Sequence, residues 1–332
     1  DRLRQPLMRV GERGHEQWKA VSWNEALDHV AERMNRIKAE HGPESVALFN
    51  HGMGQRFVQH VLRSWGVVNY AAPSYAQCRG PRDVGFVLTF GEVVGSPEPT
   101  DIKNTDCLVL IGSHLGENMH NSQVQEFAQA VERRIPVIVV DPRFSVAASK
   151  AKYWLPVKPG TDLALLLAWC GLLVREGRYD RAFVEKHGHG FDKFAAEVSG
   201  YTPEWAAREC DVPAELIVAA AREFASHRPA SIVHPGRRVN WYGDDTQRSR
   251  AIALLNALLG NYGRHGGLYV SQGIKMERYP LPKYPSSDKP RADGGDADRY
   301  PFADEGITTS IRDATISVKP YTIKGWYVYS TN

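Results

Sequence analysis

Two short apolar runs separated by a segment of helical length constrain the fold of this chain more than any other feature. Residues 108–111 and 137–140 are continuously apolar, which is typical of parallel strands buried on both faces. The segment between them predicts a helix from about Asn121 to Arg134. A strand, a helix and a second parallel strand form a βαβ unit, and this one has the layout of a nucleotide-binding unit.

Further strands and helices alternate along the chain. A capping box at Ser22 and Glu25 predicts the start of an amphipathic helix that ends near Gly42. The other predicted strands are 46–49, 231–233 and 325–329. The other predicted helices are a helix that ends near Trp65, a buried helix that includes residues 163–170, and helices around 179–186, 203–208, 213–226 and 246–259. Residues 277–304 predict a surface excursion or a crossing between domains. The alternation predicts a doubly wound α/β fold.

Composition excludes several classes of function. The 332 residues include 41 Lys and Arg against 38 Asp and Glu, and a net charge of +3 is too balanced for nucleic acid or an anionic membrane to be the main partner. No apolar run approaches the roughly 20 residues of a membrane span. The four cysteines lie too far apart for a zinc or iron–sulfur motif, and they leave the compartment open. We expect Cys107, Cys170 and Cys210 to be structural.

A glycine pair follows the strand predicted at residues 46–49. Gly52 and Gly54 match a dinucleotide-binding fingerprint poorly, because Phe57 stands at the position of the third glycine and no acid follows at the ribose-binding distance. The pair is better explained as a strand-to-helix turn that needs small residues. An ordinary nicotinamide-dependent enzyme is therefore disfavoured.

The turn over residues 111–118 is a better candidate for phosphate binding, since it opens a helix after a parallel strand. Asp141 follows the next strand, where a carboxylate can accept from a ribose or a base. The alternative is that such turns only connect α/β elements. A second glycine turn, Gly160-Thr161-Asp162, precedes the apolar helix. Asp162 is either an N-cap or the acceptor for the N1–H and N2 amine of a guanine, two parallel donors that match one carboxylate.

Cys78 is the candidate reactive thiol. It lies in a polar loop beside Arg79 and Arg82, ahead of a helix that begins near Pro81, and both features lower a thiol pKa. A thiolate there could be a nucleophile or a ligand for a soft metal. The alternative is a buried, inert cysteine.

A basic loop at residues 234–243 is a further candidate. Arg237 and Arg238 follow a predicted strand, where open α/β sheets build their sites. They could bind phosphate or an oxyanion. The alternative is a solvated loop with an aromatic anchor.

In order and spacing, these segments resemble the molybdopterin oxidoreductases of the dimethyl sulfoxide reductase family. The likeness covers nearly the whole chain, and the run Lys19–Leu27 is similar to the family's "ISWDEAL" element. The other matching segments are 1–11, 54–55, Cys78, 111–118, 141–143, 159–162 and 241–248. The runs 241–248 and 325–329 are most similar to polysulfide and thiosulfate reductase catalytic subunits.

The resemblance implies two interleaved α/β domains with mostly parallel, Rossmann-like doubly wound sheets. The first domain would comprise residues 1–75 and 275–332, and the second, nucleotide-binding domain would comprise residues 76–274 with the metal-ligand cysteine. The family's N-terminal [4Fe–4S] domain and C-terminal pterin-binding domain are absent from this sequence. We therefore expect the chain to be a fragment of a longer polypeptide.

The resemblance also implies a cofactor and its contacts. The cofactor is molybdenum, or tungsten, held by two molybdopterin guanine dinucleotides, and Cys78 aligns with the metal ligand. Gln55 and Ser74 align with pterin contacts. One dinucleotide would be held by Ile111, Gly112, Ser113, His114, Gly116, Glu117 and Asn118, with His114 in place of the family's usual Asn. Its guanosine and phosphates would contact Asp141, Pro142, Arg143, Ser145, Gly160, Thr161 and Asp162. Cofactor-facing positions are also implied for Gly236, Arg237 and Asn332.

The function implied is two-electron redox chemistry on a small inorganic substrate, of the polysulfide or thiosulfate type, by a catalytic subunit. Arg79, His114, Arg237 and Arg238 could steer an anionic sulfur compound. Formate, nitrate or arsenic-oxyanion chemistry stays open, as does a cofactor-free scaffold in a respiratory complex, against which Cys78 argues. The implied partners are an iron–sulfur electron-transfer subunit and a membrane-anchor subunit, with a [4Fe–4S] cluster that this chain does not ligate. The implied location is the periplasmic side of the membrane, with the cytoplasm as the alternative.

Overall fold

The chain divides into two compact units. One combines Asp1–Tyr75 with Arg278–Asn332 and is called the split unit here; the other, Ala76–Glu277, is called the continuous unit. The computed structural model describes residues 2–52, 54–73, 80–92, 99–113, 115, 121–236, 245–269, 280–294, 301–302 and 306–330. Both units contain helices and a parallel sheet, so the predicted α/β class with mostly parallel sheets is confirmed.

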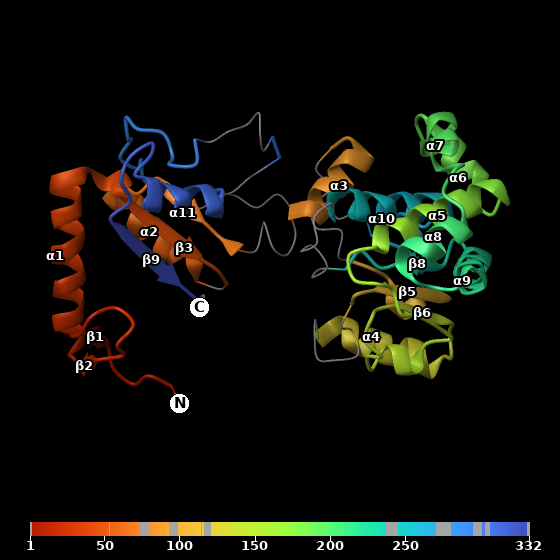
Figure 1. The fold of residues 1–332 in the computed structure, drawn as a ribbon, viewed down its shortest axis with the longest axis horizontal. Helices are drawn as coiled ribbons and strands as arrows, with labels where there is room; N and C mark the ends of the chain where they lie inside the picture. Colours follow the sequence, from red (N-terminus) through yellow and green to blue (C-terminus); the bar gives the residue numbers. More distant parts are fainter. Residues whose placement is uncertain are drawn as a thin grey trace. The chain divides into compact units, whose positions relative to one another are not determined.

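A four-stranded parallel sheet organises the continuous unit (Figure 1). Its strands, in the spatial order β7-β6-β5-β8, are β7 (Tyr153–Leu155), β6 (Val137–Val140), β5 (Cys107–Ile111) and β8 (Ser231–Val233). β5 pairs with β6 from Leu108 opposite Val137 to Ile111 opposite Val140. All residues of these two strands are buried, which explains their continuous apolar character.

Alternate residues of the sheet enter two hydrophobic cores, one on each face. Val109 and Ile111 lie in a core built by the helices α5 (Asp162–Arg175), α8 (Pro203–Cys210), α9 (Ala214–Ser226) and α10 (Asp245–Leu259). Leu108 and Leu110 lie in a second core with α4 (Asn121–Glu132). Helices on both faces of a parallel sheet are the doubly wound arrangement that the sequence predicts.

Helix α5 is apolar nearly all round because other elements surround it. Its Trp169 is fully buried, and the indole Nε1 donates to the Ile217 carbonyl at 3.0 Å. The same ring meets Phe224 at 5.1 Å between ring centroids. The prediction of a buried core helix is therefore confirmed, and no helix in the part of the chain that the structure describes is long and apolar enough to cross a membrane.

Three cysteines of the continuous unit are buried and unpaired, as predicted for structural thiols. Burial raises the pKa of Cys107 to about 12 and also raises the pKa of Cys170 and Cys210. Cys210 is the last residue of α8, where a loop between helices is expected from the sequence. The unit also contains α3 (Gly80–Phe90), α6 (Arg181–His187) and α7 (Phe191–Val198).

The split unit is built on a three-stranded parallel sheet in the order β4-β3-β9. The central strand β3 (Val46–Asn50) pairs with β4 (Asn69–Ala71) and with β9 (Gly325–Tyr329), so the first and last parts of the chain share one sheet. The other elements described in this unit are α1 (Trp23–His41), α2 (Gln55–Trp65), α11 (Thr308–Ser317) and the hairpin of β1 (Leu7–Arg9) and β2 (Trp18–Ala20).

Helix α1 begins at the predicted capping box. The Glu25 amide donates to the Ser22 hydroxyl at 3.2 Å, and the Ser22 amide donates back to the Glu25 carboxylate at 2.7 Å. No residue of α1 is buried, and Trp23 and Leu27 are 67% and 60% exposed. The capping box therefore sets where this helix begins, while little burial supports its first half.

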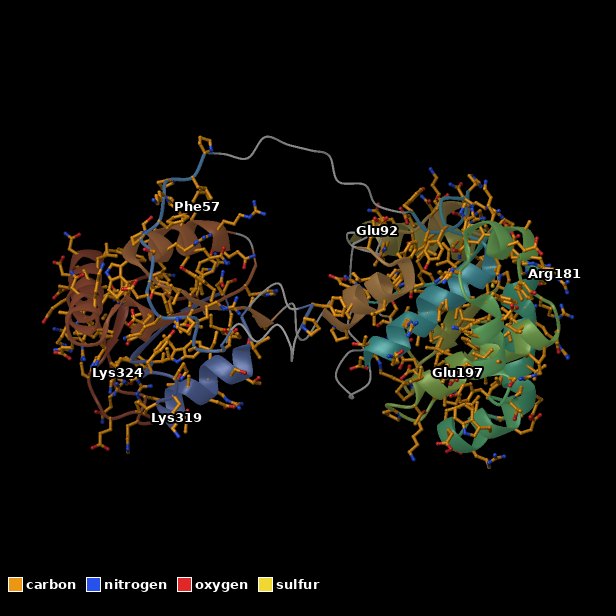
Figure 2. The ribbon with its side chains drawn as sticks, turned by 90° about the horizontal axis from the view of Figure 1, so that it is seen from above. Phe57, Glu92, Arg181, Glu197, Lys319 and Lys324 are labelled. Atoms are coloured by element: carbon orange, nitrogen blue, oxygen red, sulfur yellow. The ribbon has the colours of Figure 1, made fainter. Side chains whose placement is uncertain are left out.

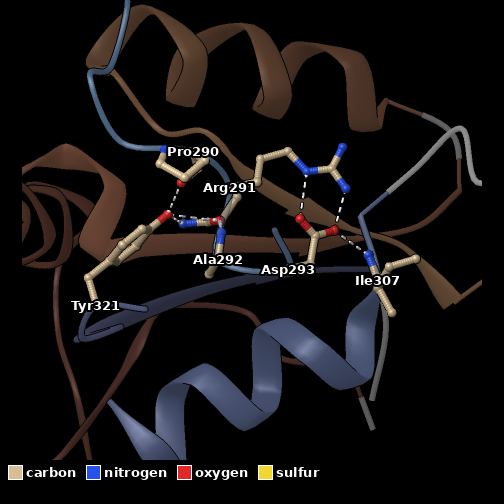
Figure 3. A network of polar contacts seen from close by, with 7 residues as sticks. Pro290, Arg291, Ala292, Asp293, Ile307 and Tyr321 are labelled. Atoms are coloured by element: carbon tan, nitrogen blue, oxygen red, sulfur yellow. Dashed lines mark hydrogen bonds and ion pairs between the residues drawn. The ribbon is translucent and has the colours of Figure 1, made fainter. Parts of the chain in front are cut away.

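Residues 277–304 are predicted to be a surface excursion or a crossing between domains, and the described part from 280 to 294 has no helix or strand. A polar network ties its end to the split unit's sheet and to α11 (Figure 3). The Ala292 amide donates to the Asn69 side chain at 2.7 Å, and the Ile307 amide donates to the Asp293 carboxylate at 2.7 Å. The chain is thus held here by hydrogen bonds between residues distant in sequence.

Candidate cofactor site at the carboxyl ends of the strands

Four loops of the continuous unit leave its sheet at one edge, because β5, β6, β7 and β8 are all parallel. Open α/β sheets bind ligands outside the carboxyl ends of their strands. The predicted site residues that the structure places at this edge, from the last residue of β5 to the first residue of α5 and in the loops, are Ile111, Gly112, Ser113, Asp141, Pro142, Arg143, Ser145, Gly160, Thr161, Asp162 and Gly236. The topology therefore gathers this predicted set at one edge of the sheet.

Gly112 makes the turn after β5. Its φ of 55° lies in the left-handed region that favours glycine, and its amide donates to the Val140 carbonyl at 2.9 Å. This hydrogen bond joins the carboxyl ends of β5 and β6. Ser113 follows and is half-buried.

The loop after β6 is shaped by its own side chains. Asp141 is buried, and its Oδ1 accepts from the Arg143 amide at 2.8 Å. The Ser145 hydroxyl accepts from the Ala148 amide at 3.2 Å. The Trp154 indole donates to the Asp141 carbonyl at 2.8 Å. Asp141 and Ser145 therefore organise the loop in addition to any contact they make with a ligand.

Asp162 is the first residue of α5, so the interpretation of Asp162 as the N-cap is wrong. The N-cap position is Thr161, whose hydroxyl donates to the Lys158 carbonyl at 2.6 Å instead of capping the helix. Asp162 is buried, and its Oδ1 lies 3.8 Å from Nε of Arg248. A carboxylate at a helix N-terminus also interacts favourably with the helix dipole.

Arg248, on the first turn of α10, is the buried cation of this edge. Its Nη2 donates to the Ile111 carbonyl at 3.4 Å, while Nε faces Asp162. Burial lowers the pKa of the guanidinium, and the charges of Asp162 and Asp245 oppose that shift. Arginine remains charged at neutral pH in any case. One side chain thus connects the end of β5 with the starts of α5 and α10.

The loop after β8 is anchored by α3. The Gly236 carbonyl accepts from Nη1 of Arg82 at 3.2 Å, and the Gly236 amide donates to Nδ1 of His234 at 3.0 Å. The Arg82 guanidinium is buried and pairs with Asp83 at 3.0 Å. Arg82, considered in the sequence as a neighbour of Cys78, therefore supports the loop that carries Gly236.

The split unit has a glycine turn of its own. Gln55 is the first residue of α2, and its Oε1 accepts from the side-chain Nδ2 of Asn50 at 3.1 Å. Gly54 has a φ of 84°, and a Cβ built there would lie 2.8 Å from the Tyr329 hydroxyl. Phe57, at the place of a third fingerprint glycine, is 80% exposed on α2 (Figure 2). This turn brings Gln55 to the carboxyl end of β3 and needs glycine for conformation and space.

Nine predicted site residues lie outside the residues that the structure describes. They are Ser74, Cys78, Arg79, His114, Gly116, Glu117, Asn118, Arg237 and Asn332. Within the described ranges, no three His, Cys, Asp or Glu side chains group as a metal site. The sequence-based expectation of a single cysteine ligand is thus not tested by these side chains.

The sequence did not predict two residues that support the site, Arg248 and Asn50. It also did not predict that Arg82 contacts Gly236. A signal existed for Arg248, since an arginine at the start of a helix that then reads Ala251-Ile252-Ala253-Leu254-Leu255 suggests a buried charge with a partner. Its partner Asp162 is distant in sequence, so the pairing itself was not predictable.

The described side chains at the continuous unit's edge fit a guanine nucleotide. Asp162 offers a carboxylate, which has two acceptor oxygens for the paired donors of guanine. Nε of Arg248 is buried and has no hydrogen-bond partner among the described residues. A buried polar atom of this kind usually finds a partner in the complete site.

Comparison with known proteins identifies relatives along the whole chain. A family model described as molybdopterin oxidoreductase matches residues 2–331. The thiosulfate reductase molybdopterin-containing subunit PhsA of Salmonella typhimurium is 35% identical over 100% of this chain and 45% of PhsA. Dimethyl sulfoxide reductase DmsA of Escherichia coli is 30% identical over 87% of this chain and 39% of DmsA.

A solved structure shares the fold. Acetylene hydratase from Pelobacter acetylenicus matches with a TM-score of 0.81 and 25% identity, over 100% of this chain and 49% of the hydratase chain. The chain spans about half the length of these relatives or less.

Proposed function

Because the chain belongs to the molybdopterin oxidoreductase family, we propose that it carries much of the cofactor site of a molybdenum or tungsten oxidoreductase. The cofactor in this proposal is a bis(molybdopterin guanine dinucleotide), one guanine of which binds at the carboxyl edge of the continuous unit's sheet. When bound, such a metal centre supplies two-electron redox chemistry. The observation that carries the proposal is the buried Asp162–Arg248 pair at the start of α5.

The chain's own residues supply simple contacts to the cofactor in this proposal. Asp162 accepts from the guanine, and the turn at Gly112 approaches the phosphates. Gln55, held by Asn50, contacts a pterin from the split unit. Cys78 supplies a thiolate ligand, which suits a soft metal. These roles need only acceptors, backbone amides and one thiol, and the cofactor carries the electron chemistry.

The substrate we propose is a thiosulfate- or polysulfide-type sulfur compound. PhsA, named as a thiosulfate reductase subunit, is 35% identical over the whole chain, whereas DmsA is 30% identical over 87% of it. Arg79, His114 and Arg237 would attract the anion. Formate, nitrate or arsenic-oxyanion chemistry is the second candidate, supported by the F420-dependent formate dehydrogenase subunit of Methanocaldococcus jannaschii, which is 28% identical over 80% of the chain.

We further propose that the protein works as a catalytic subunit in a respiratory complex. An iron–sulfur subunit would exchange electrons with it, and a membrane-anchor subunit would hold it at the periplasmic side of the membrane. Relatives named as subunits or chains of reductases support this assembly. The [4Fe–4S] cluster expected for such a protein lies outside this chain in the proposal.

The test measures metal, pterin and turnover on one preparation of the full polypeptide, purified without oxygen from a host that makes molybdopterin. We expect molybdenum or tungsten, pterin fluorescence, and viologen-linked reduction of thiosulfate or polysulfide in preference to dimethyl sulfoxide, nitrate or arsenate. Formate oxidation instead would favour the second candidate. A stable protein without metal or pterin would favour the cofactor-free scaffold.

Cys78→Ala tests the metal ligand. Turnover should be abolished while most pterin stays bound, because the substitution removes one metal ligand and leaves the many proposed contacts to the pterins in place. The matched control is Cys210→Ala, which removes a buried thiol that donates to the Ala206 carbonyl in α8 and should retain turnover. Wild-type activity in Cys78→Ala would remove Cys78 from the mechanism.

A further inference from the structure

We infer that Arg248 is a positioning residue that sets the selectivity of Asp162 for guanine. This inference rests on the proposed guanine dinucleotide site and adds a residue outside the predicted site. Three observations support it: the guanidinium is almost fully buried, its Nε lies 3.8 Å from the Asp162 carboxylate, and its Nη2 donates to the Ile111 carbonyl at 3.4 Å.

Arg248 places a positive charge beside the buried carboxylate of Asp162. A buried carboxylate without a cation moves toward water, because desolvation penalises the charge. A protonated carboxyl offers one donor and one acceptor, whereas an ionised carboxylate offers two acceptors. Guanine presents two parallel donors, N1–H and the N2 amine. Only the ionised form of Asp162 therefore matches both.

The geometry leaves the carboxylate able to bind a base. Nε of Arg248 lies 3.8 Å from Oδ1, beyond a direct hydrogen bond, so it stabilises the charge without occupying this acceptor. The second contact, to Ile111, fixes the guanidinium against the end of β5. Gly112 directly follows Ile111 in the chain. The Arg248 side chain therefore fixes the position of the proposed phosphate-binding turn relative to the Asp162 carboxylate that would bind the base.

A purely structural ion pair would have a different signature. Removing such an ion pair would weaken the binding of every nucleotide by the same factor, because the whole carboxyl edge of the sheet would lose support. Removing a positioning residue changes the ratio between two bases that differ only at the group Asp162 reads. Hypoxanthine keeps N1–H and lacks the N2 amine, so GDP and IDP are the matched pair of probes.

The experiment titrates GDP and IDP into the full polypeptide produced in a host that cannot make molybdopterin. We expect the wild type to prefer GDP about tenfold, the effect of one charge-assisted hydrogen bond. Arg248→Gln should reduce that preference to within about twofold. Arg248→Lys keeps the charge and loses the hydrogen bond to the Ile111 carbonyl, so it should retain an intermediate preference. If Arg248→Gln does not fold, the result for Arg248→Lys decides the question.

Two control variants distinguish the positioning role of Arg248 from the proposed guanine site on which it rests. Arg222→Gln breaks an exposed pair with Glu176 on the outside of α9 and should leave the ratio unchanged. Asp162→Asn should abolish the preference. If it does so while Arg248→Gln and Arg248→Lys keep the wild-type ratio, Arg248 has no positioning role and the guanine site stands. If Asp162→Asn keeps the ratio, or the wild type has no preference, the guanine site is wrong and the inference fails with it.

Discussion

The Gly112 turn of the continuous unit and the Gly54 turn of the split unit lie in units that differ in how much hydrophobic core supports them. The continuous unit has four strands with a hydrophobic core on each face, and its turn region buries the charged pair Asp162–Arg248. The main sheet of the split unit has three strands, and this unit has smaller hydrophobic clusters and a first helix with no buried residue; its turn uses the neutral pair Asn50–Gln55. In the continuous unit the larger core surrounds an ionic contact and fixes it. In the split unit the turn is held by a hydrogen bond between side-chain amides and by glycine conformation.

The largest expected effect contrasts two tryptophans. Trp169→Ala removes a fully buried indole from the core of the continuous unit and should lower the free energy of unfolding by about 3–5 kcal/mol. Trp23→Ala, at a position 67% exposed on α1, should change it by less than about 0.5 kcal/mol. Denaturant titrations of both variants measure the difference. Equal losses would mean that the exposed face of α1 is covered in solution.

A smaller effect is expected at the split unit's turn. Gly54→Ala places a methyl group 2.8 Å from the Tyr329 hydroxyl at a φ of 84°, and we expect a loss of about 1–3 kcal/mol. Gly14→Ala is the matched control, with a φ of 90° and no atom within 4 Å of the added carbon. A loss equal to the control's would show that Tyr329 moves freely and that only conformation matters.

The smallest effect concerns acid stability, which should belong mainly to the continuous unit. Burial raises the pKa of Asp180, but the hydrogen bond from the Phe183 amide and the ion pair with Arg264 outweigh it, so the pKa is lowered. A lowered carboxyl pKa gives stability that is present above the unfolded value, near 4, and is lost as pH falls through the folded value.

Asp180→Asn should therefore cost up to about 1 kcal/mol at pH 7, and the difference from wild type should begin to shrink as pH falls below about 4 and vanish below the lowered pKa of Asp180 in the folded protein. Melting curves between pH 2 and 7 measure this. A constant difference across that range would assign the effect to the N-cap geometry of α6 instead of the charge.

Local patterns predicted much of the fold, and long-range contacts account for what they missed. The capping box at Ser22 and the apolar run 108–111 act within a few residues, and both were located correctly. Strand β4 has three residues and depends on Asn69, whose side chain binds Ala292 across the chain. Helices α7 and α11 have eight and ten residues, and neither was predicted. Short elements of this kind are stabilised by tertiary packing more than by local pattern.

The candidate site shows the same division. Glycine turns and strand-end acids can be located from sequence because their spacing to a strand is local. Arg248 could not be assigned, because its contacts with Asp162 and Ile111 exist only when α10 packs beside α5 and β5. The cofactor roles of Cys78 and His114 come from the family resemblance, and both residues lie outside the described ranges.

The most direct test of the central claim is the nucleotide released by mild acid from the metal-loaded protein, quantified against its metal. Guanosine monophosphate at a level at least equal to molybdenum or tungsten, and strongly reduced in Asp162→Ala, is the predicted result. Metal and pterin with no guanine nucleotide, or guanine content unchanged in Asp162→Ala, would contradict the account.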